Sequence, residues 1–193
     1  YTAATFDGQD DAILIGGQNE TLTLANSSFT LSAWAKRAAA GQGHMILSQG
    51  SATTNKGLQF GFRPTNKFTC GFWNNDLDTS ATYADTQWHH WVCTYDAASK
   101  RRTLYRDGVQ VAQNTASVHY SGFGITYIGQ RLDGAWRFKG TIDEVGIWNS
   151  ALSADQVRTL YEKVKVADET VLTCQLPAAA GNQLTMHDLV LRQ

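Results

Sequence analysis

The segment that decides the fold is FKGTIDEVGIWN, at residues 138–149. It gathers isoleucine, valine and tryptophan, which favour strands, between Gly140 and Asn149, which interrupt them. We therefore predict a β-strand here. The pattern of a strand is followed here, after a short loop, by the pattern of a helix.

Residues 150–161, SALSADQVRTLY, predict one short helix. Ser153 can cap the first turn, and Gln156 can reach back to the amide of Ser153, which makes a capping box. One face of the helix then carries the side chains that recur at helical spacing, namely Leu152, Gln156, Val157 and Leu160. A single late helix in a β-rich chain predicts an all-β protein with one short C-terminal helix.

The rest of the chain reads as short strands separated by turns, at a spacing of roughly 8–12 residues that is typical of a sandwich or jelly roll. The strongest hairpin signal is Asp107-Gly108, because a type I′ turn needs positive φ at both central residues. Near the C-terminus, residues 171–176 and 184–191 look like two further strands. We therefore expect antiparallel sheets throughout.

Composition excludes several classes of function. The chain has 193 residues, a length that suits one sandwich or two small domains, and its 42% hydrophobic content with six tryptophans can fill a large core. Charged residues make up only 17% of it and the net charge is −1, so no basic field attracts nucleic acid. No apolar run reaches the length of a membrane span. We expect neither a nucleic-acid partner nor membrane insertion.

The three cysteines, Cys70, Cys93 and Cys174, are too few for a disulfide scaffold and lack the CxxC spacing of a metal site. Cys70 and Cys93 lie in consecutive strand-like segments, at 67–73 and 88–95. If those strands pair, a cross-strand disulfide can form. The alternative is three buried thiols that act as small apolar side chains.

Four sequence blocks together resemble the laminin-G-like, or concanavalin A-like, jelly-roll domains, which are related to the pentraxins. The blocks are FDGQDD at 6–11, FTLSAW at 29–34, WHH at 88–90 continuing to YRDG at 105–108, and GTIDEV at 140–145 continuing to Leu152-Ser153. The resemblance implies two antiparallel sheets packed face to face, with recognition at a concave face or at the rim loops. We assign residues 1–166 to this domain and 167–193 to a C-terminal extension that adds strands to the same sandwich.

The residues argue against catalysis. Glycan-cleaving members of this fold class place two glutamates on one strand, on either side of an aspartate, whereas Thr141 and Val145 occupy those positions around Asp143. The chain also lacks a nucleophile elbow and a zinc-protease HExxH motif. His89 and His90 belong to the WHH block, where a packed or hydrogen-bonded role is expected. We predict that the domain is not an enzyme.

The resemblance also implies a structural calcium ion, with Asp10, Asp11 and Asp143 as the matching acids. Calcium takes six to eight oxygen ligands, and loops at strand ends supply both carboxylates and carbonyls. The alternative is that aspartates in turns bond to their own backbone.

Sugar sites combine an aromatic platform with amide, carboxylate or guanidinium groups. Two loop-like stretches offer that combination, and their candidate ligand residues are Trp73, Asn74, Asn75, Asp76, Arg131, Asp133 and Trp136. Three other tryptophans, Trp34, Trp88 and Trp148, lie within or beside the family blocks and are expected in the core.

We therefore expect a non-catalytic binding module, extracellular or at the cell surface, that recognises carbohydrate with possible help from calcium. Its partner would be a glycan or an extracellular protein, and the domain would form part of a larger multidomain chain. Two alternatives stay open: a structural or adhesive spacer that binds other proteins, and an accessory domain of a carbohydrate-active enzyme.

Overall fold

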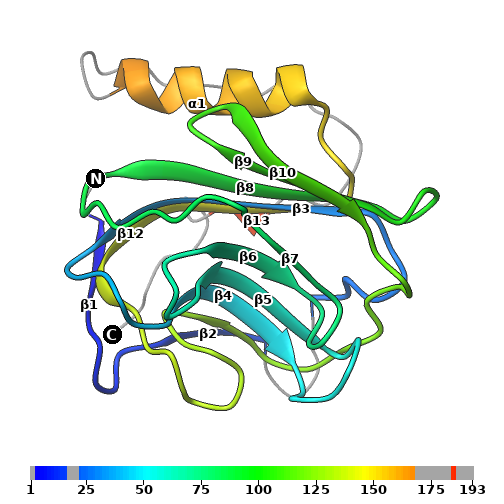
Figure 1. Ribbon diagram of the computed structural model, residues 1–193, viewed down its shortest axis with the longest axis horizontal. Helices are drawn as coiled ribbons and strands as arrows, with labels where there is room; N and C mark the ends of the chain where they lie inside the picture. Colours follow the sequence, from blue (N-terminus) through cyan, green and yellow to red (C-terminus); the bar gives the residue numbers. More distant parts are fainter. Residues whose placement is uncertain (1–2, 17–21, 168–183, 186–193) are drawn as a thin grey trace.

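The computed structural model describes residues 3–16, 22–167 and 184–185, and shows two antiparallel sheets stacked face to face with one helix outside them (Figure 1). This arrangement confirms the predicted jelly-roll sandwich. Among the described residues, no helix combines the length and the apolar character needed to cross a bilayer.

The first sheet has seven strands, which run in the spatial order β1-β12-β3-β8-β9-β10, with β13 also beside β12. Every described pair within it is antiparallel. The strands are β1 (Ala4–Asp7), β3 (Phe29–Arg37), β8 (His89–Asp96), β9 (Arg101–Arg106), β10 (Val109–Thr115), β12 (Lys139–Trp148) and β13 (Leu184–Thr185).

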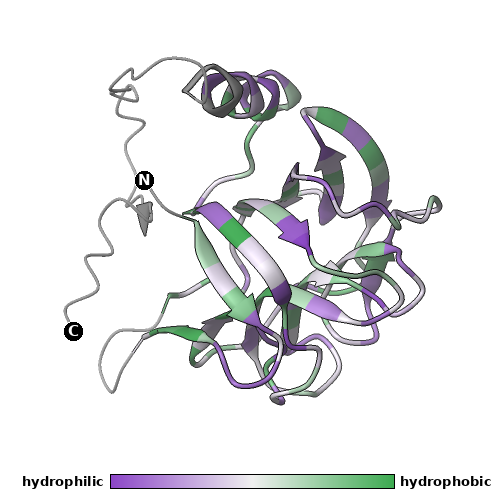
Figure 2. Ribbon diagram, turned by 90° about the vertical axis from the view of Figure 1, so that its left-hand side faces the viewer, coloured by the Kyte–Doolittle hydropathy of each residue, from purple (hydrophilic) through white to green (hydrophobic). Residues whose placement is uncertain are grey.

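The second sheet has six strands in the order β2-β11-β4-β5-β6-β7, and these pairs are antiparallel as well. They are β2 (Ile13–Ile15), β4 (His44–Gly50), β5 (Gly57–Phe62), β6 (Phe68–Gly71), β7 (Asp76–Asp78) and β11 (Thr126–Ile128). Successive side chains of a strand point to opposite faces of its sheet, so each strand contributes alternate residues to the core. Figure 2 shows polar and apolar segments alternating along several strands.

The core lies between the two sheets and is rich in aromatic rings. Phe68 of β6 and Trp91 of β8 stack in parallel across it, with ring centroids 4.0 Å apart. Cys70 and Cys93, on the same two strands, form a disulfide with Cα atoms 6.3 Å apart. These strands belong to different sheets, so the premise that they pair is wrong. The bond instead joins the two layers through the core.

Both local turn predictions are confirmed. In the hairpin between β9 and β10, Asp107 and Gly108 have φ values of 53° and 76°. Helix α1 (Ala154–Ala167) begins with the predicted capping box. The Ser153 amide donates to Gln156 Oε1 at 2.8 Å, and the Gln156 amide donates to Ser153 Oγ at 3.3 Å.

Helix α1 covers the outward face of the first sheet (Figure 1). Val157 is fully buried there against Val92 of β8 and Tyr105 of β9. Tyr161 stacks on Trp34 of β3, with ring centroids 5.7 Å apart. The helix therefore packs through an apolar and aromatic face while its capping residues stay exposed.

The tryptophan assignments need correction. Trp34 lies between the first sheet and α1 rather than between the sheets, because its neighbours Ala33 and Ala35 take the inward positions. Trp88 precedes β8 and is 37% exposed. Trp148, at the end of β12, is only partly buried. Membership of a sequence block did not predict which face of the sheet a side chain takes.

The predicted C-terminal strands fall largely outside the described residues. Within them, β13 pairs antiparallel with β12 through Leu184 and Thr185. Residues 168–183 and 186–193 lie outside the described ranges, and the predicted strand at 171–176 is among them. The division of the chain at residue 166 stays a prediction.

Candidate functional site

The outward face of β5 is made of small and polar residues. Its inward side chains, Leu58, Phe60 and Phe62, belong to the core. The alternate positions are Gly57, Gln59 and Gly61, which therefore point away from it. Because Gly57 and Gly61 carry no side chains here, neighbouring segments pack directly on the β5 backbone and bury it.

A hairpin at residues 129–138, which links β11 to β12, packs above β5 and its neighbour β4. Ser48 of β4 donates from Oγ to the carbonyl of Gln130 at 2.8 Å. The Leu132 side chain lies so close to Gly57 that a Cβ there would stand 3.0 Å from it. The hairpin closes on itself because the Arg131 amide donates to the Ala135 carbonyl at 2.9 Å.

A second loop approaches from β6 and carries Trp73. Asn55 donates from its amide to the Trp73 carbonyl at 3.1 Å, which ties this loop to the β4–β5 loop. Asn75, two residues after Trp73, is held by Arg102 of β9 in the other sheet, whose guanidinium donates to the carbonyl and the side-chain oxygen of Asn75. Arg102 is fully buried, and burial lowers its pKa to about 10. The loop is thus anchored by groups from both sheets.

The two loops meet at Arg131. Its guanidinium carbon lies 4.1 Å from the ring centroid of Trp136 and 5.2 Å from that of Trp73. We call Trp73, Arg131 and Trp136 the aromatic cluster. A cation over an indole face is a favourable contact of about 1 kcal/mol at a partly exposed site. The cluster therefore fixes two tryptophans on one outer surface of the sandwich.

The backbone of both tryptophans is unusual. Trp73 has φ of 58° and Trp136 has φ of 47°, in the left-handed region that bulky residues rarely enter. Trp136 also packs on Gly43, where a Cβ would lie only 2.4 Å from its ring. Such conformations cost free energy and gather at functional sites. They are the sharpest local sign that this surface has a role beyond folding.

Carboxylates hold the arginines of this surface. Arg131 donates to both oxygens of Asp133, at 2.8 and 2.7 Å, and this hydrogen bonding keeps the pKa of Asp133 below its usual range. Arg63, which follows β5, donates to Asp76 and Asp78 of β7, each at 2.8 Å. Its guanidinium carbon also lies 5.9 Å from the ring centroid of Trp136.

The structure brings together four of the seven predicted ligand residues: Trp73, Arg131, Asp133 and Trp136. Asp76 lies on the same outward face, because its carboxylate sits where a Cβ of Gly71 would be. The other two are bonded elsewhere. Asn74 is exposed and donates to Thr54 at 3.1 Å, and Asn75 donates to the side chain of Asn55 at 2.8 Å.

Sequence reasoning missed Gln59 and Arg63 as members of this surface. The signal for Gln59 was present, since β5 alternates large apolar residues with glycine and glutamine. Arg63 carried no comparable signal, because its partners Asp76 and Asp78 come from a strand two places across the sheet.

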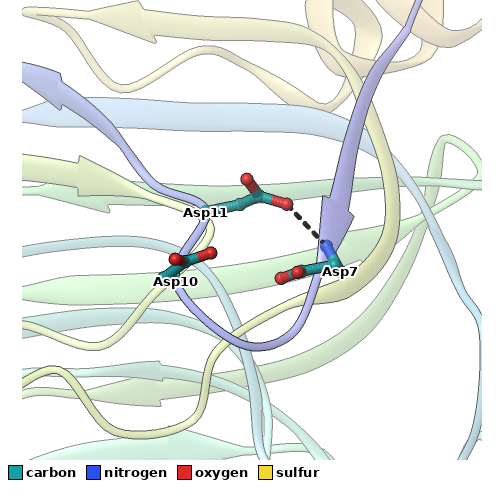
Figure 3. Close-up of side chains that lie close together, drawn as sticks. All are labelled: Asp7, Asp10 and Asp11. Atoms are coloured by element: carbon teal, nitrogen blue, oxygen red, sulfur yellow. Dashed lines mark hydrogen bonds between the residues drawn. The ribbon is translucent and has the colours of Figure 1, made fainter.

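Two of the three predicted calcium ligands lie together, beside a third aspartate that was not predicted (Figure 3). Asp10 and Asp11 form an exposed group with Asp7, with one carboxylate oxygen from each lying within 4.8 Å of the others. Asp143 instead pairs with Trp34 inside the first sheet, and the described residues place it in no such group. The three oxygen donors are of the kind that calcium takes.

Two oxygens of this acidic group already have partners. Asp11 Oδ2 accepts from the Asp7 amide at 2.8 Å, and Asp7 Oδ1 accepts from the Gln9 amide at 2.6 Å. These bonds are the ones that aspartates make in turns without a metal. Calcium binding stays a prediction, with Asp7 in the place that Asp143 was expected to fill.

A hollow opens at the edge of the core, where Arg37 and Trp91 lie beside the loop that carries Tyr83 and Asp85. It has room for little more than one water molecule. Its histidine, His89, is held between Asp85 and Asp107, at 2.8 and 2.6 Å. This hollow is too small for a sugar, so the aromatic cluster remains the candidate ligand site.

The fold and its motifs define a family. The chain belongs to the concanavalin A-like lectin/glucanases superfamily, whose family model matches residues 7–158. Among curated protein sequences, none matches the chain.

Solved structures of this fold include a native heptameric pentraxin from Limulus polyphemus, 17% identical, with a TM-score of 0.61 over 81% of this chain and 80% of that one. The CBM40 domain of the Ruminococcus gnavus IT-sialidase, bound to α2,3 sialyllactose, is 16% identical, with a TM-score of 0.60 over 71% and 84%. Domain 4 of an extracellular arabinanase from Geobacillus stearothermophilus, in complex with arabinotriose, is 19% identical, with a TM-score of 0.55 over 83% and 87%. At these identities the likeness establishes the fold.

Proposed function

We propose that this chain is a non-catalytic carbohydrate-binding module that holds its glycan on the outward face of the six-stranded sheet, at the aromatic cluster. The observation that carries the proposal is the pair of partly exposed tryptophans, Trp73 and Trp136, fixed in left-handed backbone around Arg131. Pyranose and furanose rings present apolar C–H faces, which pack on indole, and hydroxyl rims, which bond to amides and carboxylates.

The surface around the cluster supplies the polar groups that such a ligand needs. Asp133 and Asp76 carry carboxylates on this side of the sheet, and the amide of Gln59, which is 3% exposed, lies beneath them. Because the loops are bonded to both sheets, the surface is largely preformed, and little conformational entropy is lost on binding. Two structural neighbours, a sialidase domain and an arabinanase domain, are bound to oligosaccharides, which agrees with this use of the fold.

A role outside the cytoplasm is part of the proposal. The disulfide between Cys70 and Cys93 lies in the core and joins the two sheets, and such bonds persist in oxidising compartments. We place the domain in a secreted or surface protein, where it tethers a larger chain to glycan. An accessory domain of a carbohydrate-active enzyme is the form of this role that the two sugar-bound neighbours suggest.

The test is a glycan-binding screen with the intact domain, followed by affinity measurements on Trp73→Ala and Trp136→Ala. Each change should weaken the strongest interaction at least about tenfold, since buried aromatic contacts dominate such sites. Trp88→Ala is the matched control, because Trp88 is also exposed but lies outside the cluster. Unchanged glycan affinity in both cluster variants would show that the glycan does not bind at the aromatic cluster.

A protein-binding role is the second candidate, and one observation favours it. Phe123 is 80% exposed in a loop between Gly122 and Gly124. Isolated exposed apolar residues are common on proteins. If the glycan screen is blank, this loop is the first surface to test with Phe123→Ser.

A further inference from the structure

We propose that the aromatic cluster selects neutral glycans and discriminates against sugars that carry carboxylate or sulfate groups. This inference rests on the proposed function, because it names the class of glycan that the same site takes. Two features carry it. The guanidinium groups of Arg131 and Arg63 are already ion-paired within the protein, and the unpaired side-chain atoms nearby are hydrogen-bond acceptors.

The guanidinium groups are occupied. Arg131 donates two hydrogen bonds from one edge of its guanidinium to the carboxylate of Asp133, with both N–O distances at or below 2.8 Å. Arg63 donates to Asp76 and Asp78 from two different nitrogens. An anionic sugar needs the same planar donor edge, so it would have to displace an internal carboxylate that is already held in place. Three aspartates neutralise these two arginines, and with the neighbouring Arg137 counted the surface carries no excess of positive charge.

One further arginine stands close by in the sequence. Arg137 follows Trp136, and its Nη1 donates to Gln130 Oε1 at 2.8 Å. Among the described residues, no carboxylate forms an ion pair with it. A Cβ at Gly134, next to Asp133, would lie 3.9 Å from its Nη2, so this guanidinium stands beside the tip of the hairpin. Arg137 is therefore the cation whose removal has to be included in the test.

The unpaired atoms favour a ligand that donates hydrogen bonds. Ser48, Gln59, Gly71 and Asp76 are register partners in one row across β4, β5, β6 and β7. In that row Gln59 Oε1 and Asp76 Oδ1 are buried and have no hydrogen-bond partner, and the Gln59 residue is only 3% exposed. Buried acceptors without donors are unfavourable. A sugar hydroxyl can donate to them, whereas a carboxylate or sulfate adds another acceptor.

The row lies under the hairpin that carries Arg131. Ser48 beside Gln59 bonds to the hairpin backbone, and Leu132 packs on Gly57 two residues before Gln59. A ligand that reaches the two acceptors therefore lies beside this hairpin, where the ion pair with Asp133 keeps Arg131 neutralised. Such a ligand gains hydroxyl contacts, and the guanidinium groups of Arg131 and Arg63 that it meets are already neutralised.

The experiment uses affinity electrophoresis on the whole domain with paired polysaccharides, in which each acidic polymer is also supplied with its carboxylates reduced to neutral sugar. Arabinotriose and sialyllactose are compared by calorimetry at 20 and 500 mM NaCl, as neutral and acidic oligosaccharides. The neutral member of a pair should bind at least tenfold more tightly than its acidic partner, and its affinity should change less than twofold between the two salt concentrations.

Asp133→Asn releases Arg131 from its carboxylate and should reduce the preference for the neutral member at least threefold. Asp155→Asn is the control, because Asp155 pairs with Arg158 on the exposed side of α1. Tighter binding of the acidic members by the unaltered domain, weakened by salt and lost in Arg137→Gln, would overturn the selectivity while leaving the glycan site in place. Failure of every member to bind would overturn the proposed function itself.

Discussion

The guanidinium of Arg131 lies over the indole of Trp136, 4.1 Å from the ring centroid. The carboxylate of Asp133, two residues further along the same hairpin, neutralises that guanidinium. One residue thus organises an aromatic surface without leaving a free positive charge on it. The same arginine also reaches Trp73, which comes from a loop more distant in the sequence. The site therefore depends on the way the fold brings two loops together.

Gly43 should be essential for the position of Trp136. A Cβ at residue 43 would lie 2.4 Å from the indole ring, closer than atoms can approach. We expect Gly43→Ala to push the ring aside and to weaken glycan binding at least about tenfold while the sandwich still folds. Ala39→Ser, an exposed change in the same connection, is the control. Unchanged affinity in Gly43→Ala would show that the ring position does not matter.

The disulfide should contribute strongly to stability. Cys70 and Cys93 enclose a loop with a sequence separation of 23 residues, and closing a loop of this size typically stabilises a domain by about 3 kcal/mol. Dithiothreitol should lower the melting temperature of the unaltered domain. The double variant Cys70→Ala/Cys93→Ala should melt at a low temperature that reductant does not change. A melting temperature insensitive to reductant in both proteins would contradict the bond.

Acid should destabilise the domain through two buried histidines. Burial lowers the pKa of His44 and of His90 to about 4, and Arg37 adds to this effect for His44 while Asp107 opposes it for His90. The folded state therefore binds fewer protons than the unfolded chain, whose histidines titrate near 6.5. The contribution of the neutral histidines to the free energy of unfolding is fully present above that pH. It is lost as the pH drops toward 4, by up to about 3 kcal/mol for each histidine.

Urea unfolding between pH 7.5 and 4.5 measures this loss. His90→Gln should be less stable at pH 7.5, because Nε2 of His90 shares a hydrogen bond with Ser32, but its stability should fall less steeply on acidification. Identical slopes in the two proteins would exclude His90 as a source of the pH dependence.

Calcium binding is tested by thermal melts with calcium and with chelator. If calcium binds at the turn of Asp7, Asp10 and Asp11, the melting temperature should rise with calcium, and Asp10→Asn should show no such increase. Asp143→Asn should respond to calcium as the unaltered domain does, since Asp143 lies elsewhere in the first sheet. A melting temperature unaffected by chelator would remove calcium from the account.

Local features of the sequence predicted local structure well. The capping box at Ser153 and Gln156 and the turn at Asp107-Gly108 form as expected, because each depends on a few neighbouring residues. The four blocks predicted the sandwich because they recur in the order that this fold requires. Trp88 was predicted wrongly to lie in the core, because it precedes β8 and the motif does not specify where that strand begins.

The site was only partly predictable for the same reason. Trp73 and Trp136 stood out as aromatic residues in polar loops, but nothing local indicates that Arg131 would lie over both rings. That contact depends on the crossover from β11 to β12, which carries the hairpin over the outward face of β5. The anchoring contact that Asn75 receives from Arg102 was equally invisible in the sequence, because Arg102 lies on the other sheet.

The central claim is that glycan sits on the aromatic cluster, and the indole N–H signals of the six tryptophans test it most directly. In a ¹⁵N-correlation spectrum these signals can be assigned with single Trp→Phe variants and followed during titration with the best glycan from the screen. We predict that the signals of Trp73 and Trp136 shift with a common saturation curve while that of Trp34, beneath α1, stays in place. Shifts confined to tryptophans outside the cluster would contradict the account.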